Sequence, residues 1–516
     1  MTKAPGVTSI KIRMYRHGFG DCFLLSFFHK DDRVFSMLVD CGIKLNTKSD
    51  AVPIEDVIDD LKATLTPADG KKPELDVLVA THEHWDHVAF FHPTRSPNYF
   101  SDFKIGQVWL AWTEDPEDEE AVTINSRLRE GAAALQIAAT RLQAAEKKEK
   151  DRWNTLHSGL GIAKARSEFN AALENVLGFY GVAVASKTKT STSGIKYKIK
   201  TKISVETEVA MNHVVELGNV GGSIDYLSPS TKVDKRKLPE GVNVYVLGPP
   251  RSSLINKSNA SSGAAKETYL GIDQTGLTSF IDGLLQMGAS PSGIAAANAD
   301  GPFVECEGKS SMSAKKAKDN PYWKRYFAKA EEHRQIDNAW LDVAGQFALQ
   351  LDGAINNTSL VLAIELEESG KVLLLPGDAQ VGSWLSWHEY TWKVKRNGKT
   401  ETITAEDLLR NTVLYKVSHH GSHNATVKEK GLEMMTHPDL VAMIPEKEKS
   451  YNGIIYEPLI DHLKQLCKGR VLVSADVAYP PENLLKKRPT GLSATEWKAF
   501  KADLTVDRVY IEYTIQ

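Results

Sequence analysis

The chain has 516 residues, of which 42% are hydrophobic and 25% are charged, so it is long enough to bury a full hydrophobic core and more than one lobe. Its 63 Lys and Arg residues nearly balance 66 Asp and Glu residues, and the formal net charge is −3. This balance excludes a global positive field that would recruit nucleic acid, so any polyanion site must be local.

The cysteines and the N-terminal sequence indicate the cellular compartment. Cys22, Cys41, Cys306 and Cys467 lack the paired spacing of a zinc ribbon or redox motif, and four cysteines are few for a disulfide scaffold. The first residues contain no apolar signal segment, and no run approaches the roughly 18 apolar residues that span a bilayer. We therefore expect a cytoplasmic protein that does not associate with membranes.

Short apolar segments separated by turn residues predict four strands in the N-terminal part of the chain. A helix is predicted before the last of them, because apolar residues recur at helical spacing in VPIEDVIDDLKATL (52–65), behind Pro53. This order predicts an α/β layer architecture. The strand segments are SIKIRMY (9–15), CFLLSFF (22–28), VFSMLVDCG (34–42) and LDVLVATH (75–82).

The middle of the chain has a different character. Residues 118–180 are rich in alanine and charge, and two heptad-like apolar runs predict a helical hairpin, interpreted as a lid or packing arm, or alternatively as a coil for a protein partner or self-association. Residues 251–320 are polar and rich in Gly and Ser, which predicts loops. We expect 111–350 to be an insertion between residues 1–110 and 351–516, the two halves of one domain.

A lysine-rich segment, 186–202, lies within this insertion. Lys196, Lys198, Lys200 and Lys202 alternate as one face of a strand would. They form the best local basic stripe for binding a nucleic acid or nucleotide substrate. The alternative is an edge strand that lysines protect from pairing with other chains.

The C-terminal part returns to strands, with one amphipathic helix, EPLIDHLKQLC (457–467), between two of them. The predicted strands lie in NNTSLVLAIEL (356–366), GKVLLLPGDA (370–379), TVLYKVSHHGS (412–422), PDLVAMIPE (438–446), RVLVSAD (470–476) and DRVYIEYTI (507–515).

The motif THEHWDH (81–87) follows a buried strand and is the strongest functional signal. In an extended turn His82 and His84 point the same way, while Asp86 and His87 follow around the bend, so one loop can serve two adjacent metal sites. Imidazole and carboxylate groups suit zinc or manganese. The spacing therefore predicts a site for divalent metal ions, zinc before manganese.

Further metal ligands are expected at the ends of C-terminal strands. Asp378, in LLLPGDA, has a carboxylate that can bridge two cations, and YKVSHHGSHN contains His419, His420 and His423. Because each of these candidates follows a strand, we expect them to meet in one cleft at a sheet edge.

The order LVDCG, THEHWDH, PGDA and SHHGS resembles the metallo-β-lactamase-fold hydrolases. The segments GFGDCFLLSF, NNTSLVLAIE and YKVSHHGS are most similar to the branch that includes the hydrolase domains of ComEC-type DNA-uptake proteins. The resemblance covers residues 10–90 and 355–480 and implies an αβ/βα four-layer sandwich with a two-metal site along one edge.

The resemblance also implies roles for individual residues. His82 and His84 would hold the first metal, and Asp378 would bridge to the second. Asp40 would orient a ligand. The second metal would be held by Asp86, His87 and His420, although the choice between His419 and His420 stays open.

One departure from the family concerns the first metal. Many members have a further histidine before the GD strand, and this chain has NNTSLV there, with Asn357 and Ser359 as in the ComEC-type branch. We expect a more open first site or a ligand from the insertion, for which His213 and His333 are candidates. His84 replaces the acidic residue of diiron relatives and favours hydrolysis over oxygen chemistry.

Two metals that activate a bridging hydroxide suit attack on phosphorus, so a phosphodiesterase or nuclease is the leading hypothesis. Asp86 would orient the hydroxide and His419 would return a proton to the leaving oxygen. A hydrolase of a small phosphoester, lactone or lactam is the alternative, followed by a non-catalytic binding protein. His17 and His423 are further candidates for the cleft.

An aromatic segment, SWLSWHEYTW (383–392), follows the GDA turn. It contains Trp384, Trp387, His388, Tyr390 and Trp392. These side chains would form either a base-stacking platform or, as we favour, part of the core.

Overall fold

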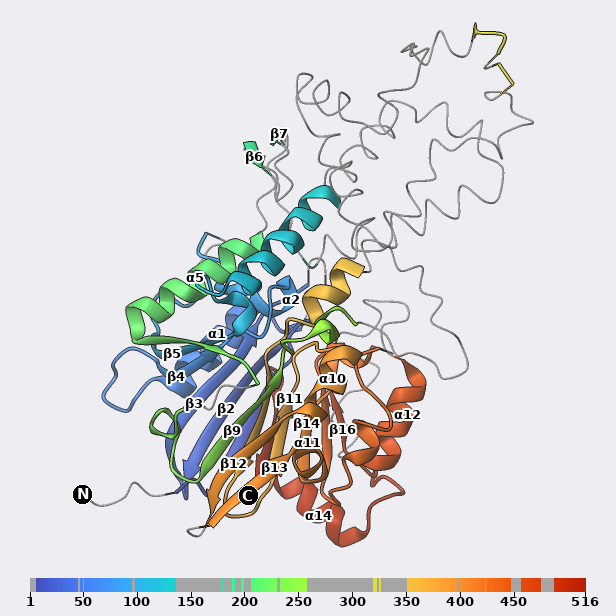
Figure 1. Cartoon of the computed structure of the whole chain (residues 1–516). Helices are drawn as coiled ribbons and strands as arrows, with labels where there is room; N and C mark the ends of the chain where they lie inside the picture. Colours follow the sequence, from blue (N-terminus) through green and yellow to red (C-terminus); the bar gives the residue numbers. More distant parts are fainter. Residues whose placement is uncertain are drawn as a thin grey trace.

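Two β-sheets form the body of the protein in the computed structural model (Figure 1). The chain has mixed α/β structure, as predicted. The structure describes residues 6–44, 47–49, 51–94, 98–135, 206–229, 233–257, 350–396, 399–422, 424–446, 456–474 and 487–516, with Phe179 and the short segments 188–190, 196–198, 319–322 and 324–325.

The first sheet has eight strands and mixes two kinds of pairing. Its first five strands pair antiparallel, and the strands from β3 to β8 pair parallel. In spatial order the strands are β17 (Leu504–Val506), β18 (Tyr510–Ile515), β1 (Ser9–Tyr15), β2 (Cys22–His29), β3 (Asp32–Cys41), β4 (Glu74–Val79), β5 (Lys104–Ala111) and β8 (Ser223–Leu227).

The second sheet has six strands. Four of them, from β16 to β11, pair parallel, whereas β10 and β9 pair antiparallel. The spatial order is β16 (Val471–Val473), β15 (Val441–Ile444), β14 (Thr412–Lys416), β11 (Val372–Leu375), β10 (Val361–Leu366) and β9 (Val242–Gly248).

The sheets pack face to face around one apolar core. Met14 and Val79 from the first sheet join Leu362, Leu373 and Met443 from the second, and all five are buried. Alternation along β1, where every second residue is buried, turns one face of that strand into this core. Parallel strands such as β14 are buried throughout, because helices cover their outer face.

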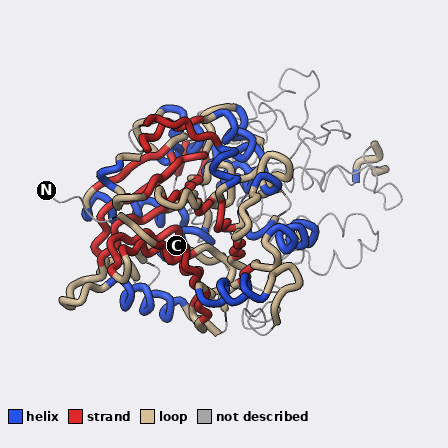
Figure 2. Tube along the Cα trace, turned by 90° about the horizontal axis from the view of Figure 1, so that it is seen from below, coloured by secondary structure: helices blue, strands red, loops and turns tan. Residues whose placement is uncertain are grey.

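Helices cover the outer face of each sheet, so the molecule has a helix, sheet, sheet, helix order of layers (Figures 1 and 2). The first sheet packs against α1 (Ile54–Leu65) and α5 (Glu206–Gly221). The second packs against α10 (Val381–Ser386), α11 (Ala405–Arg410) and α12 (Glu457–Leu466). Such layering lets every element bury its apolar face.

Several shorter elements complete the described structure. They are α2 (Trp85–Val88), α14 (Ala494–Ala502), the hairpins β6 (Thr188–Thr190) with β7 (Lys196–Lys198) and β12 (Thr391–Arg396) with β13 (Lys399–Thr404), and the 3₁₀ turns η1 (Ala89–Phe91), η2 (Trp112–Glu114), η3 (Lys235–Lys237), η4 (Ser253–Asn256), η6 (Trp387–Glu389), η7 (Ser418–Gly421) and η8 (Leu432–Met434). Residues 119–135 and 350–356 are also helical.

The strands and helices predicted at both ends of the chain are confirmed within a few residues. Of the predicted helical hairpin, 119–135 is helical and most of the rest lies outside the described residues, as does most of 251–320. β8 and β9 belong to the stretch predicted as an insertion, yet each pairs with a core strand.

Core packing is confirmed for two of the aromatic residues after the GDA turn. Trp384 and Trp387 are both fully buried, and their ring centroids lie 4.0 Å apart. Neither ring is exposed as a stacking platform would be. Across the described ranges, no helix combines the length and apolar character that a membrane crossing requires.

Candidate metal centre

The predicted ligands meet at the carboxyl ends of parallel strands. THEHWDH follows β4, Asp378 lies three residues beyond the end of β11, and His420 lies four residues beyond the end of β14. In open α/β sheets the carboxyl ends of parallel strands form the crevice in which ligands bind. The site therefore joins the two sheets, one contributing three histidines and an aspartate and the other a histidine and an aspartate.

Close backbone packing shapes the THEHWDH turn. The backbone N–H of Asp21 donates to the carbonyl of Asp86 at 2.8 Å, and that of Ile43 donates to the carbonyl of Trp85 at 3.2 Å. A Cβ atom on Gly42 would lie 2.3 Å from the carbonyl carbon of Asp86. Only glycine fits there, so the loop after β3 presses directly on the motif.

Asp86, His87, Asp378 and His420 form a buried cluster that could hold a metal ion. One donor atom from each residue lies within 4.8 Å of the others. Nε2 of His87 lies 3.2 Å from Oδ2 of Asp378, and Nε2 of His420 lies 3.1 Å from Oδ2 of Asp86. All four side chains are at most 1% exposed, so water does not compensate these polar groups.

Hydrogen bonds on the far side of each ring assign the protons of these histidines. Nδ1 of His420 lies 2.6 Å from the carbonyl oxygen of Pro445, which can only accept, so this nitrogen carries a proton. Nδ1 of His87 lies 2.8 Å from Oδ2 of Asp40 and donates to it. The remaining nitrogen, Nε2, is then the one that each ring presents to the cluster.

In a neutral cluster these Nε2 atoms would place lone pairs against carboxylate oxygens. That contact is repulsive unless a positive charge lies between them, and the charge must come from protons or from a metal ion. Burial would lower the pKa of His87, but Asp378, Asp21 and Asp40 outweigh it and hold that pKa well above its usual range. The pKa of His420 is raised mainly by Asp378, again against burial. The site thus attracts cations.

His82 and His84 lie beside this cluster. Nε2 of His82 and Nδ1 of His84 are 3.1 Å apart. The hydroxyl of Thr81 donates to Asp40 at 2.7 Å and lies 3.1 Å from Nδ1 of His82, from which it can accept. Burial lowers the pKa of both rings, that of His84 to about 4. Two neutral rings with adjacent nitrogens are suited to metal binding.

The carboxylate of Asp378 divides its oxygens between two environments. Oδ1 lies 3.1 Å from the ammonium of Lys416 and accepts the backbone N–H of His419 at 3.2 Å. Oδ2 faces His87 and is buried without a hydrogen-bond partner. Burial would raise the pKa of Asp378, but Lys416, His87 and His420 hold it well below its usual range. One oxygen is therefore structural and the other is available to a ligand.

The backbone after β14 explains which histidine joins the cluster. His419 and His420 have φ values of 46° and 52°, a left-handed conformation that is strained for both residues and is common at functional sites. This turn directs the ring of His420 to Asp86. The ring of His419 instead lies near Asn356, with Nε2 3.5 Å from the amide nitrogen. His420 is therefore the one that joins the cluster.

The residues predicted to support the ligands contact a ligand or the PGDA turn. Asp40 accepts from His87 and also from the backbone N–H of Thr81 at 2.7 Å. Ser359 accepts the backbone N–H of Asp378 at 3.1 Å, and Asn357 accepts that of Gln380 at 3.1 Å. Asn357 and Ser359 thus hold the PGDA turn, whereas Asp40 orients a ring.

Other predicted candidates do not belong to the cluster. His213, on α5, contacts Glu216 at 3.1 Å, and His17 is buried with Nε2 2.7 Å from the carbonyl of Gly42. Lys196 and Lys198 are in β7, whose partner is β6. Three sets of candidates lie outside the described residues: Lys200 with Lys202, His333, and His423.

Sequence reasoning missed four charged residues at the site. Asp21 bonds Lys416 at 2.6 Å, and Asp352 lies 3.9 Å from His84. Glu83, inside the motif, accepts from Arg129 and from Thr207, each at 3.0 Å. Asp21, Glu83 and Lys416 stand within GFGDCF, THEHWDH and YKVSHHGS, and a charged residue in a buried segment is a signal that it has a partner.

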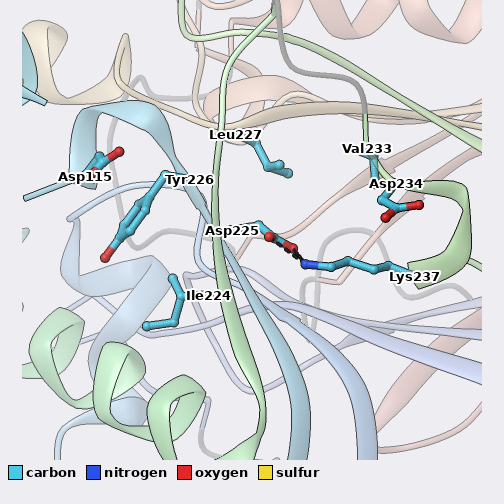
Figure 3. Close-up of a pocket in the computed structure, with 8 residues that line it drawn as sticks. All are labelled: Asp115, Ile224, Asp225, Tyr226, Leu227, Val233, Asp234 and Lys237. Atoms are coloured by element: carbon cyan, nitrogen blue, oxygen red, sulfur yellow. Dashed lines mark hydrogen bonds and ion pairs between the residues drawn. The ribbon is translucent and has the colours of Figure 1, made fainter. Parts of the chain in front are cut away.

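A cavity of about 270 Å³ lies beside β8 and η3 (Figure 3). Its lining includes Asp115, Asp225, Asp234 and Lys237, and the ammonium of Lys237 lies 2.6 Å from Asp225. The lining contains no histidine or cysteine. The His and Asp cluster is therefore the better donor set for a transition metal.

Comparisons with known proteins do not extend these assignments. Neither a scan against protein-family models nor a search of curated proteins gives a match to this chain.

Proposed function

We propose that this chain is a dinuclear metal-dependent hydrolase with the αβ/βα sandwich of the metallo-β-lactamase fold, and that it cleaves phosphodiesters. Two packed sheets with helices on both outer faces support the fold. The order of THEHWDH, Asp378 and His420, each after a strand, supports the family.

One observation carries the proposal. His87 and His420 present Nε2 to Asp378 and Asp86, while an acceptor holds the opposite nitrogen of each ring. In metalloproteins a ligating histidine typically donates its other ring N–H to a carboxylate or carbonyl group. The pairs with Asp40 and with the Pro445 carbonyl follow this rule, which indicates that the rings are oriented to bind a metal.

The residues present fit two adjacent divalent ions. His82 and His84, with Asp378, would hold the first ion. Asp86, His87, His420 and Asp378 would hold the second, so Asp378 would contribute to both ions. A donor set rich in imidazole favours zinc, with manganese as the alternative.

When bound, such a metal pair supplies a hydroxide near neutral pH and neutralises charge on both the attacking and leaving oxygens. The residues of this chain orient the reaction. Asp86 retains Oδ1 without a hydrogen-bond partner, and His419 retains Nδ1 in the same condition. We assign Asp86 to hold the hydroxide proton and His419 to contact the leaving oxygen.

The test is hydrolysis of bis(p-nitrophenyl) phosphate, single-stranded DNA, double-stranded DNA and RNA by the full-length protein, with Zn²⁺ and Mn²⁺ added separately. Asp378→Asn and His84→Ala should abolish every activity that the wild-type protein shows. Activity unaffected by both variants would exclude the metal centre as the catalyst. Hydrolysis of a lactone or lactam, with no phosphodiester cleaved, would exclude the phosphodiesterase assignment.

Polymer and compact substrates can be separated in the same assay. Cleavage of a polymer should weaken steeply as salt rises, because phosphate contacts release counterions. Changing Lys196, Lys198, Lys200 and Lys202 together to Gln should then reduce cleavage of DNA or RNA and leave the small diester unaffected. Salt-independent cleavage of the small diester alone would assign a compact substrate.

A further inference from the structure

Asp352 is a carboxylate that faces His84 from the side opposite His82. It lies in the helical segment 350–356, with Oδ1 3.9 Å from Nε2 of His84. The other ring nitrogen, Nδ1, lies 3.1 Å from Nε2 of His82. The two nitrogens of His84 therefore face different groups, the carboxylate of Asp352 and the ring of His82. The side chain of Asn356, which bonds Asp352, also interacts with His84.

Asp352 is held in place by its own helix. Its Oδ2 accepts a hydrogen bond from the amide of Asn356, one turn later, at 3.3 Å. Its Oδ1 is buried without a hydrogen-bond partner, although the side chain as a whole is 16% exposed. A covered carboxylate oxygen without a partner is costly and requires an explanation.

In the rest of the site, outer acceptors determine which nitrogen of each histidine ring faces the cluster. There Asp40 accepts the Nδ1 proton of His87 at 2.8 Å and leaves Nε2 for the cluster. His82 and His420 are held in the same way by the hydroxyl of Thr81 and the carbonyl of Pro445. Of the four predicted ligand rings, His84 is the one that presents Nδ1 inward, so its outer nitrogen is Nε2.

We propose that Asp352 is a positioning residue that accepts the Nε2 proton of His84 and so commits Nδ1 to the first metal ion. The inference rests on the metal centre of the proposed function and supplies a partner that the family resemblance did not indicate. The contact of 3.9 Å is longer than a hydrogen bond and would shorten when the metal is bound. Long contacts in the unliganded state commonly tighten in this manner.

Two substitutions distinguish this role from direct metal ligation. Asp352→Asn keeps an oxygen that can accept from Nε2 but removes the charge, and Asp352→Ala removes both. An orienting acceptor is therefore largely restored by Asn. A ligating carboxylate is not, because an amide oxygen is a poor ligand for zinc. Asp225→Ala is the matched control, since Asp225 pairs with Lys237 outside the cluster.

The experiment measures how many ions the full-length protein binds and how tightly, by competition between the protein and a chelator for Zn²⁺. The absorption spectrum of the Co²⁺-loaded protein reports the coordination at each site. Asp352→Ala should weaken the binding of one of the two ions by about 10- to 100-fold, the usual effect of losing an outer partner. Asp352→Asn should retain most of the affinity and a wild-type Co²⁺ spectrum, and Asp225→Ala should change neither.

Several results would overturn the inference. Wild-type affinity for both ions in Asp352→Ala would show that Asp352 does not act on the centre. Equal loss in the Asn and Ala variants, with altered Co²⁺ spectra, would make Asp352 a direct ligand instead. If the wild-type protein binds no metal, the proposed function itself is contradicted, and this outcome is distinct from a failure of the role of Asp352. If Asp352→Ala does not fold, Asp352→Leu replaces it in the comparison, because its side chain branches at the same carbon and also lacks a charge and an acceptor.

Discussion

Nε2 of His420 lies 3.1 Å from Oδ2 of Asp86, although 334 positions separate the two residues. Asp86 follows a strand of the first sheet and His420 follows a strand of the second. Because the sheets pack face to face, the carboxyl ends of their parallel strands lie at one edge, and this contact joins the two halves of the site.

His420→Ala should remove a metal ion, whereas His419→Ala should not. Of these two rings, that of His420 faces Asp86 and Asp378, so its loss should reduce the bound metal by one equivalent. The rate of hydrolysis should also fall, and by a larger factor than the loss of an outer partner of a ligand causes, which is about 10- to 100-fold. Elemental analysis of the purified variants gives the metal content. His388→Ala is the control, because His388 contacts the carbonyl of Lys430 away from the cluster; equal metal loss in the His419 variant would contradict the assignment.

Asp40→Asn should weaken metal binding by about 10- to 100-fold without unfolding the protein. The substitution preserves the shape of the side chain but removes the charge that holds the proton of His87. Unlike Asp352, Asp40 accepts with both oxygens from fixed donors, the backbone N–H of Thr81 and the ring of His87, so the amide nitrogen of an Asn would face one of them. Asp40 has a φ of 57°, a conformation that Asn tolerates better than Ala does. Chelator competition measures the affinity, and thermal unfolding checks the fold. Unchanged metal affinity in a folded variant would show that Asp40 does not orient His87.

Much of the fold could be predicted because local patterns determine it. Alternation in SIKIRMY and the helical spacing in α1 reflect burial on one face, which a sequence records directly. The pairing of β8 with β5 could not be predicted, since more than a hundred residues of different composition intervene. Long-range pairing depends on the packed sheets and has little local signal.

The candidate site, too, could be predicted from the sequence only in part. His82, His84, Asp86 and His87 share one motif, so their proximity was readable from spacing alone. The choice between His419 and His420 was not, because it depends on a left-handed backbone at both residues. The hydrogen bond from His420 to the Pro445 carbonyl was equally hidden, since a backbone acceptor has no residue signature.

Trp384→Ala should destabilise the protein by about 3–5 kcal/mol. Its ring is fully buried, packs against the ring of Trp387 and donates a hydrogen bond to the carbonyl of Ala379 at 3.2 Å. Denaturant unfolding measures the loss. The metal stoichiometry of the folded fraction should not change. A stable variant that binds substrate poorly would instead support the stacking platform.

The pair between Glu83 and Arg129 should connect the metal loop to helix 119–135. Glu83 stands between His82 and His84, and Arg129 reaches it at 3.0 Å from outside the motif. Glu83→Gln, Arg129→Met and the double variant form a thermodynamic cycle in which a coupling of about 0.5–3 kcal/mol is expected. Additive effects on unfolding would show that the two side chains do not interact. Lys104→Met with Glu74→Gln, an exposed pair, supplies the reference cycle.

Glu114 should make the stability of the protein fall as pH rises toward neutrality. Burial, reinforced by Glu83, raises its pKa from 4.5 to about 7, against the effect of Arg129. The folded state therefore binds a proton more tightly than the unfolded state does. Between these two pKa values, deprotonation of Glu114 favours unfolding. The contribution of this group to stability is therefore fully present below about pH 4.5 and decreases up to about pH 7. Glu114→Gln stays neutral and should flatten that decrease. Urea unfolding at about pH 5 and about pH 8 compares the two proteins, and an equal pH dependence in both would show that Glu114 does not titrate in this range.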